Sequence, residues 1–472
     1  MAFWAMGAQI ARLRKRGLQR RPSKKDFYVR VFVLFACLCH SLWALADVAP
    51  ADYQTPPGWR TECMGRVQFD VPKDIAWHTS SGYWQYYNFE LPDPTITPGD
   101  KQIAYGEGLT GELPFLVDIE VSPLTTRALY EQIRYVQSLT RGPAQERVVK
   151  AQMEALDAAI SASRDDETRY RALSDQYYDL REKLQRIGYV NSQLVVLDDM
   201  IKQFTGEGRS VAKLQVERDA FFEEQAQWPT DVEYEHERFI ELGVPDASAN
   251  WYEGNLTAYL WRDQRIYRFK FYSGANTATD TAALARLEPR ARAVLAAFRT
   301  RKQYEIPQDN GFCVPFGFIA DDGTPRHAIT LGLNPADNPN LLHRLSMSSD
   351  SDKAVEMVPM LLDRLIANPF PLQISVDKFG PSSVRIGAAK GRFGGARFRV
   401  YEPDSLKPAA TETFRMVAGA LSSGYQPTVV LGVTDEHSEP PLQFEPSRDE
   451  FLRTLQSIRA LPGGHRFEPQ VD

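Results

Sequence analysis

The chain has 472 residues, more than one ordinary domain usually holds, so two domains of roughly 150 to 250 residues are expected. Hydrophobic residues make up 43% and charged residues 25% of the chain, which indicates a folded globular protein and excludes a low-complexity one. The whole chain carries −6, and its first 46 residues carry nine basic side chains and one acid, or +8, which leaves −14 for the rest. This acidic body argues against nucleic acid as a partner, because phosphate binding needs a basic face.

The N-terminal segment has the parts of an export signal. After the basic stretch come thirteen largely apolar residues, Val31–Trp43, fewer than the about twenty that span a bilayer. Ala44-Leu45-Ala46 follows, the small-x-small pattern that a signal peptidase accepts, so we expect a mature chain that begins at Asp47. The mature protein is then expected in the periplasm, and an uncleaved inner-membrane anchor is the alternative.

The cysteines fit an exported protein. Removal of residues 1–46 takes away Cys37 and Cys39 and leaves Cys63 and Cys313. An even number of cysteines in an exported chain indicates one disulfide, here closing a loop whose entropy is worth roughly 4 to 5 kcal/mol. A pair of buried free thiols is the alternative. Two cysteines without neighbouring histidines cannot form a structural zinc site.

The first part of the mature chain is predicted to form strands. Arg66–Pro72 alternates apolar and polar residues, as a half-buried strand does, and Pro72 ends it. Gly82–Phe89 is rich in aromatic residues, and Phe115–Val121 has the composition of another strand.

Residues 124–228 change character and predict long helices. Apolar residues recur there at steps of three and four, as packing along a coiled-coil seam requires. We expect breaks at Gly142-Pro143, Ser163–Thr168, Gly188 and Gly206-Glu-Gly208. These breaks would let the helices fold back as an antiparallel coiled-coil hairpin inserted in the first domain. The module is either a structural spacer or an arm that binds a partner, and the sequence favours neither.

Strands are expected again after the helical module. Val232–Leu242 is interpreted as a strand, on which Glu233, Glu235 and Glu237 share a solvated face instead of forming a catalytic cluster. A hairpin is predicted for Leu256–Trp261 and Ile266–Phe271. An amphipathic helix over Thr281–Arg301 then completes an N-terminal α+β domain, residues 47–306.

Residues 307–472 are predicted to form a second α+β domain. Its expected strands are Gly311–Ile319, Ala328–Leu333, Ala396–Tyr401 and Pro427–Val433. Its expected helices are Glu356–Ile366 and Ser447–Leu461. The run Gly387–Gly395 lacks the Gly-Lys-Ser/Thr of a phosphate-binding loop, so we interpret it as a turn that allows close backbone approach.

The sequence offers no convincing catalytic, cofactor-binding or metal-binding motif. It has neither a Gly-x-Ser-x-Gly elbow nor a His-Glu-x-x-His pair, and no two of its seven histidines are at ligand spacing. Ser346–Asp352 resembles a calcium loop in composition only, because the required glycine and glutamate are absent. We therefore expect a protein that is not an enzyme and has no cofactor and no small-molecule substrate.

Four short motifs occur in order along the two α+β parts. They are Glu62-Cys-Met-Gly-Arg-Val-Gln-Phe-Asp-Val-Pro72, Gly311-Phe-Cys313, Gly391-Arg-Phe-Gly-Gly395 and Ser457-Ile-Arg459. In that order the motifs resemble those of the two-domain immunity proteins that protect bacteria against type VI secretion lipase effectors. The resemblance assigns structural roles to Gly65, Arg66, Asp70, Pro72, Gly311, Gly391, Gly394 and Arg459.

The resemblance also implies a function. A protein of that family is periplasmic and not catalytic, and it binds and occludes a co-encoded phospholipase effector. The helical module is longer than this resemblance leads us to expect. An exported envelope scaffold that uses the coiled-coil arm is the alternative, and an exported hydrolase with an unrecognised site is a third, weaker one.

Overall fold

The structure is a computed structural model, and it describes residues 54–80, 83–84, 87, 89–99, 101–275, 280–349, 374–387, 389–401, 408–420, 428–435 and 442–462. These residues belong to one compact unit. The expected signal segment with Ala46 and Asp47, and the helix expected at Glu356–Ile366, lie outside the described residues. None of the described helices combines the length and apolarity that crossing a bilayer requires.

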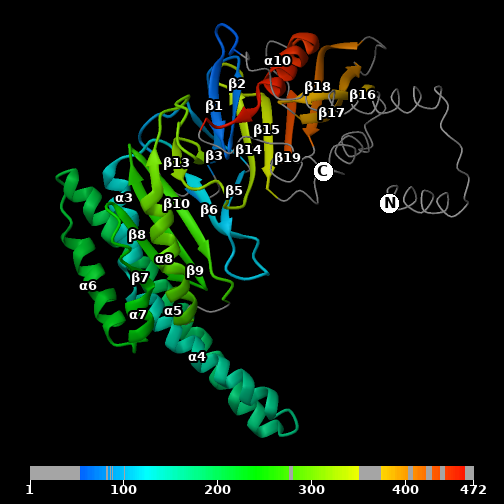
Figure 1. The fold of residues 1–472 in the computed structure, drawn as a ribbon. Coiled ribbons are helices and arrows are strands. Elements are labelled where there is room, and N and C mark those ends of the chain that lie inside the picture. Colours follow the sequence, from blue (N-terminus) through cyan, green and yellow to red (C-terminus); the bar gives the residue numbers. More distant parts are fainter. Residues whose placement is uncertain are drawn as a thin grey trace, which may run out of the picture. The chain divides into compact units, whose positions relative to one another are not determined.

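The described chain mixes helices and sheets, and the predicted α+β class is confirmed (Figure 1). The strands before the helical module are β1 (Arg60–Met64), β2 (Val67–Val71), β3 (Ile75–Ser80), β4 (Ile96–Pro98), β5 (Lys101–Glu107) and β6 (Phe115–Val121). Those that follow it are β7 (Phe239–Ile240), β8 (Ala247–Tyr252), β9 (Asn255–Arg262), β10 (Arg265–Tyr272), β11 (Phe298–Thr300), β12 (Gly311–Val314) and β13 (Gly317–Ala320). The last group is β14 (His327–Pro335), β15 (Leu341–Ser348), β16 (Ile374–Ile386), β17 (Ala389–Tyr401), β18 (Pro408–Ala420), β19 (Thr428–Asp435) and β20 (Arg459–Ala460).

Most of these strands form one large sheet. Its order is β16-β17-β18-β19-β15-β14-β5-β6-β10-β9-β8-β7; in addition, β3 pairs with β14 and β4 pairs with β3. β14 pairs antiparallel with both β15 and β5, so strands from either side of residue 307 share this sheet. They also share one hydrophobic core, which includes Phe69, Phe269, Ile329 and Phe414. The division into domains at residues 306 and 307 stays a prediction.

Two small sheets flank the large one. One has the order β1-β2-β20 and so joins the start of the described chain to its end. The other has the order β11-β13-β12. An isolated bridge between Gly65 and Cys313 connects the two small sheets.

The helices are α3 (Arg127–Ser138), α4 (Arg141–Ala162), α5 (Glu167–Gly206), α6 (Ala212–Ala226), α7 (Val232–Arg238), α8 (Thr281–Ala297) and α10 (Phe444–Ser457). Side-chain caps fix several of their starts: the Asp166 carboxylate accepts from the Arg169 amide and the Asp280 carboxylate from the Ala283 amide. α8 buries Leu284, Leu287 and Leu295 in the large core. Its last predicted turn is instead strand β11.

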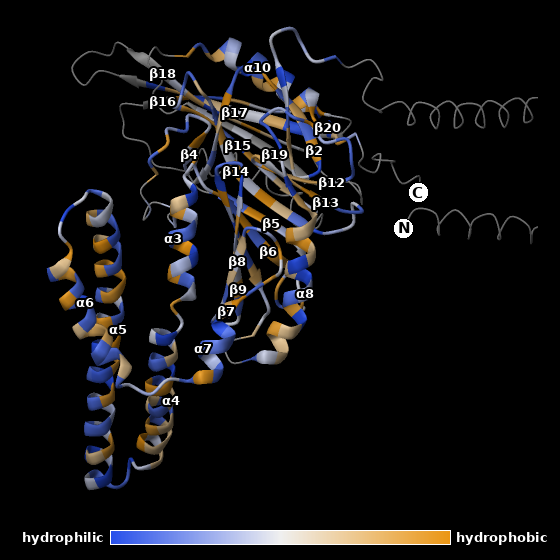
Figure 2. Cartoon of the chain, turned by 90° about the vertical axis from the view of Figure 1, so that its left-hand side faces the viewer, coloured by the Kyte–Doolittle hydropathy of each residue, from blue (hydrophilic) through white to orange (hydrophobic). Residues whose placement is uncertain are grey.

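The helical module forms as a set of helices packed side by side (Figure 2). A short turn over residues 163–166 reverses the chain, so α4 and α5 run antiparallel, and α6 then packs along α5. Two of the four expected breaks occur, at residues 163–166 and after Gly206. The break expected at Gly142-Pro143 was misplaced, because the chain breaks at residues 139–140 and Gly142 and Pro143 belong to the first turn of α4. The break expected at Gly188 was wrong, because α5 is continuous from Glu167 to Gly206. A single glycine inside a helix costs only about 1 kcal/mol relative to alanine, which the flanking packing outweighs.

Two further predictions from the sequence were wrong. Val232–Leu242 is mostly helix α7, because Asp231 caps it by accepting from the Tyr234 amide, and strand β7 has two residues. The run Gly387–Gly395 is not one turn. The chain turns at Gly387, which has a φ of +56°, and Gly391, Gly394 and Gly395 lie within strand β17. The predicted hairpin at β9 and β10 is confirmed, with Asp263 and Gln264 at positive φ in its turn.

Candidate functional site

The two cysteines that were predicted to pair form a disulfide. Cys63 lies on β1 and Cys313 on β12, both are fully buried, and their Cα atoms are 5.9 Å apart. Beside the disulfide, the Gly65 amide donates to the Cys313 carbonyl at 2.8 Å and the Cys313 amide donates to the Gly65 carbonyl at 2.7 Å. A covalent bond and two backbone hydrogen bonds thus join the two small sheets.

Gly65 is required at this junction. Its φ of +58° is one that side chains rarely adopt. A Cβ there would also lie 2.8 Å from Cδ1 of Ile329 and 3.3 Å from Cε of Met347. These contacts explain on steric grounds why the first motif has a glycine at position 65.

Arg66, the next residue after Gly65, forms further contacts across the same junction. Its guanidinium makes two hydrogen bonds to the Asp321 carboxylate, at 2.8 and 2.9 Å, and donates to the carbonyls of Gly311 and Pro325. The Tyr105 hydroxyl donates to the same carboxylate at 2.7 Å. Burial, together with the Asp321 charge, raises the pKa of Tyr105, so this hydroxyl remains a donor. Such bidentate arginine–carboxylate pairs are geometrically specific.

Asp70 and Arg459 connect the first motif to the last. Asp70 is fully buried, and its carboxylate accepts from the Thr61 hydroxyl at 2.8 Å and from both terminal nitrogens of Arg459 at 3.2 Å. The Asp70 amide donates to the Ser457 hydroxyl at 2.7 Å. Pro72 follows directly after β2. The end of the described chain is thus held against its start.

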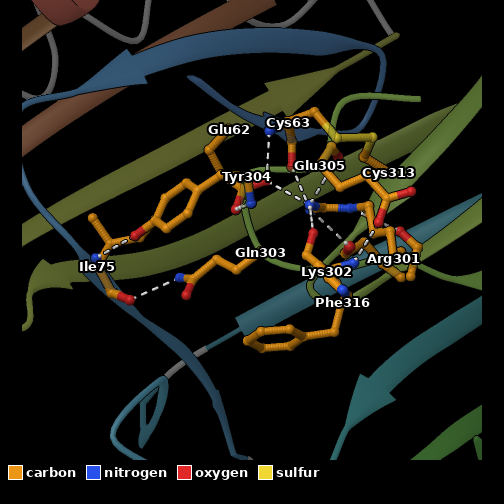
Figure 3. Close-up of polar contacts among 12 residues, drawn as sticks. Glu62, Cys63, Ile75, Arg301, Lys302, Gln303, Tyr304, Glu305, Cys313 and Phe316 are labelled. Atoms are coloured by element: carbon orange, nitrogen blue, oxygen red, sulfur yellow. Dashed lines mark hydrogen bonds and ion pairs between the residues drawn. A yellow bond between two sulfur atoms is a disulfide. The ribbon is translucent and has the colours of Figure 1, made fainter. Parts of the chain in front are cut away.

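A third arginine–carboxylate pair, which the sequence did not predict, lies next to the disulfide (Figure 3). Arg301 and Glu62 have side-chain exposures of 2% and 0%, and their charged atoms are 2.6 Å apart. The guanidinium also donates to the carbonyls of Cys63 and Val314, and the Cys63 amide donates to the Glu62 carboxylate. Arg301 had been interpreted as the end of an amphipathic helix, so nothing in its local pattern indicated this role.

The residues that follow Arg301 attach strand β3 to the same cluster. The Ile75 amide donates to the Tyr304 hydroxyl at 2.9 Å, and the Gln303 side chain donates to the Ile75 carbonyl at 2.8 Å (Figure 3). The Tyr304 amide donates to the Glu62 carboxylate at 3.1 Å. Burial, as the largest cause, raises the pKa of Tyr304 to about 12.

The contacts of these residues hold strands together. We call the set the motif cluster: Glu62, Cys63, Gly65, Arg66, Asp70, Arg301, Cys313 and Arg459. Its carboxylates are paired with arginines and its cysteines with each other. In the described part of the chain, no group of three or more His, Cys, Asp or Glu side chains could hold a metal ion. The arrangement anchors strands and offers no exposed nucleophile or base.

Two motif glycines lie outside the motif cluster. Gly391 and Gly394 belong to β17, where a Cβ on Gly391 would approach the Gly419 carbonyl oxygen to 2.7 Å. The close backbone approach expected of this segment is therefore present within a sheet. Gly311 borders the motif cluster, because its carbonyl accepts from Arg66, and a Cβ there would lie 2.3 Å from the Ile319 carbonyl oxygen.

Exposed apolar side chains gather on the helical module. Ten large apolar side chains are exposed in the described part of the chain, and eight of them belong to α3, α5 or α6: Tyr135, Val136, Tyr170, Tyr178, Tyr189, Val196, Val216 and Phe222. On α5, spacings of eleven and seven residues place Tyr178, Tyr189 and Val196 on one face. Tyr189 also meets Phe221 of α6 edge to face at 6.0 Å. Clustered apolar exposure of this kind marks interaction surfaces.

Comparisons with known proteins find matches among solved structures only. No protein-family model and no curated protein matches the chain. The structure is similar to the immunity protein TplEi of the T6SS from Pseudomonas aeruginosa complexed with "L" peptide, at a TM-score of 0.42 and 13% identity over 86% of this chain and 99% of that one. It is similar to apo TplEi, at a TM-score of 0.43 and 13% identity over 86% of this chain and 98% of that one. It is also similar to a chain of the Tle4–Tli4 complex, at a TM-score of 0.43 and 13% identity over 87% of this chain and 99% of that one.

Proposed function

We propose that the protein is a periplasmic immunity protein that binds a co-encoded type VI secretion lipase effector and occludes it without catalysing a reaction. The observation that carries the binding part of this proposal is the apolar exposure of the helical module. Eight of the ten exposed large apolar side chains of the described residues lie there. The helical module then acts as a partner-binding arm instead of a spacer.

The immunity part of the proposal rests on the sequence motifs. Residues of three of the four motifs that resemble the lipase-immunity family meet in the motif cluster, where they anchor strands. A rigid scaffold without an exposed reactive group suits a protein that works by stoichiometric binding. Export would place it where an incoming lipase has to be met, and the disulfide suits an oxidising compartment.

The first experiment tests binding and protection together. The full chain is expressed with its own leader, purified from the periplasm and titrated with the lipase-like protein encoded by the neighbouring gene. We expect a stoichiometric complex, loss of lipase activity and survival of cells that carry the lipase in their periplasm. Failure to bind and failure to protect would sink the proposal, and ester hydrolysis by the purified chain alone would indicate an enzyme.

A triple variant tests the role of the helical module. Tyr178→Ser, Tyr189→Ser and Phe222→Ser together remove exposed aromatic contacts from α5 and α6, so we expect binding of the lipase to weaken by about tenfold to a hundredfold. Tyr252→Ser is the matched control, because Tyr252 is 43% exposed but lies outside the helical module. Equal loss in both variants would contradict a specific role for the module.

A further inference from the structure

One face of α5 carries two opposite charges that have no counter-ion in the described part of the chain. Arg181 is exposed and forms no ion pair with a described residue. Asp199 accepts a hydrogen bond from the Gln132 side chain at 2.9 Å but meets no cation among the described residues. Arg181 and Asp199 are eighteen positions apart, which is five full turns, so they project from the same side of the helix.

The residues between these two charges form one continuous stripe. Steps of four, three, four, three and four residues lead from Arg181 to Asp199, and such steps keep side chains on one face of a helix. Each residue of this set is exposed or half-buried, whereas Ile187, Leu194 and Leu197 lie on another side of α5 and are buried. We call the set the α5 stripe: Arg181, Gln185, Gly188, Ser192, Val195 and Asp199.

The centre of the α5 stripe is open. A Cβ on Gly188 would meet nothing within 4 Å, and Ser192, one turn later, is exposed. A glycine inside a helix lowers stability relative to alanine, and no contact within the described chain requires one at this position. Two small residues one turn apart let the backbone of another helix come close. The place of closest possible approach is therefore midway between the two charges.

The α5 stripe is complementary to itself. Arg181 and Asp199 lie nine residues, or about 14 Å, on either side of residue 190. If two copies of α5 cross antiparallel at residue 190, each Arg181 faces Asp199 of the other copy, and each Gly188 faces Ser192. Every contact then occurs twice, as in the isologous interface of a two-fold dimer. A foreign helix would need opposite charges at the same spacing.

The charge balance of α4 and α5 permits a second copy to approach. Residues 141–206 contain ten basic and eleven acidic side chains, so they carry −1, whereas the chain after residue 46 carries −14. Charges on the rest of each copy are screened beyond about 8 Å at physiological ionic strength. A ligand with charges of one sign, such as nucleic acid or an acidic polypeptide, would meet one favourable and one unfavourable end of the α5 stripe. A second copy meets two favourable ends.

We propose that the protein forms a reversible two-fold dimer in which the α5 stripes of two copies pack antiparallel. The α5 stripe is about 27 Å long, which is short for a permanent interface, so we expect a dissociation constant of about 10 µM. The exposed residues Tyr178, Tyr189 and Val196 lie about 70° further round α5. The dimer and the lipase would thus use different faces of α5, and the dimer does not rest on the proposed function.

Charge reversal tests the dimer. The full chain, expressed with its own leader and purified from the periplasm, is measured by sedimentation equilibrium. Arg181→Glu and Asp199→Arg each place like charges at both ends of the crossing, so each variant should dimerise at least about tenfold more weakly than wild type. An equimolar mixture of the two variants should associate again, because opposite charges then meet at both ends. Arg171→Glu reverses an exposed charge of α5 outside the stripe and should dimerise as wild type does.

Gly188→Leu provides an independent test, because the new side chain enters open space in the monomer but occupies the crossing point in the dimer. We expect an unchanged or higher melting temperature and dimerisation at least about tenfold weaker. A wild type that stays monomeric up to about 200 µM overturns the proposal. So does a dimer that both charge reversals leave intact, or a mixture of the two variants that stays dissociated. If wild type is monomeric and Gly188→Leu instead loses the lipase, the α5 stripe docks that partner and not a second copy.

Discussion

Buried charged side chains hold the motif cluster together, and among them we expect Arg301 to be the most sensitive to substitution. Arg301→Met would leave Glu62 as a fully buried carboxylate without its arginine, so we expect the free energy of unfolding to fall by about 3 to 5 kcal/mol. Guanidinium unfolding measures this change. The double variant Glu62→Gln with Arg301→Met should cost less than the single one, because no uncompensated charge remains.

An exposed pair provides the control for this prediction. Arg171 and Glu167 are 2.6 Å apart on α5, but their side chains are 75% and 77% exposed. Arg171→Met should therefore change the free energy of unfolding by less than about 1 kcal/mol. Similar costs for the two arginine substitutions would mean that burial does not determine the strength of the inner pair.

His327 makes stability depend on pH. It is 2% exposed, neither ring nitrogen has a hydrogen-bond partner, and burial, reinforced by the nearby Arg66 charge, lowers its pKa to about 4. The unfolded state, with a histidine pKa near 6.5, binds the proton first, so stability is lost as the pH falls from about 6.5 towards 4. Between pH 7 and pH 5 this loss amounts to about 2 kcal/mol.

Urea unfolding of His327→Leu at both pH values checks this prediction. The variant should lose about 2 kcal/mol less than wild type between pH 7 and pH 5. His236→Leu, which changes an exposed histidine on α7, should leave the pH dependence as in wild type. An unaltered pH profile in His327→Leu would show that other groups carry the acid sensitivity.

At the scale of elements, we expect substitution of two glycines, one in a strand and one in a helix, to change stability in opposite directions. A Cβ on Gly395 in β17 would lie 2.2 Å from the Arg415 carbonyl oxygen, so Gly395→Ala should cost about 1 to 3 kcal/mol. A Cβ on Gly188 in α5 would meet nothing within 4 Å, so Gly188→Ala should stabilise by about 0.5 to 1 kcal/mol. Thermal unfolding of both variants distinguishes the two roles, and equal signs would contradict this account.

Elements with a strong local pattern could be predicted from the sequence. The hairpin of β9 and β10 and the helices α4, α5 and α6 follow from alternation and from steps of three and four. α7 could not be predicted in the same way. Its seven residues alternate in charge like a strand, and the deciding contact is one cap from Asp231. Gly391 and Gly394 were interpreted as a turn, because only the pairing of β17 with its neighbours β16 and β18 shows that they belong to a strand.

At the scale of the whole molecule, the sequence indicated contacts but not the architecture that produces them. The disulfide followed from the number of cysteines that remain after export, and the motif residues followed from a resemblance. The pairing of β14 with β5, more than 200 residues earlier in the chain, has no local signal, because such strand partners are chosen by long-range packing. The same holds for the pair of Glu62 and Arg301, which are distant in sequence and meet only once β1 and β12 are joined.

The disulfide closes a loop with a sequence separation of 250 residues, and therefore restricts more than half of the chain in the unfolded state. The combined variant Cys63→Ala and Cys313→Ala should lose about 5 kcal/mol of unfolding free energy, through a much larger unfolded ensemble. Guanidinium unfolding of wild type in excess reductant should show a comparable loss, and the variant should not respond to reductant. Labelling of the unfolded, unreduced protein with iodoacetamide provides the independent check. Label on Cys63 and Cys313, or a variant as stable as wild type, would mean that the native protein carries two buried thiols. The link between the small sheets would then rest on the hydrogen bonds of Gly65 and Arg66 and on the pair of Arg301 with Glu62.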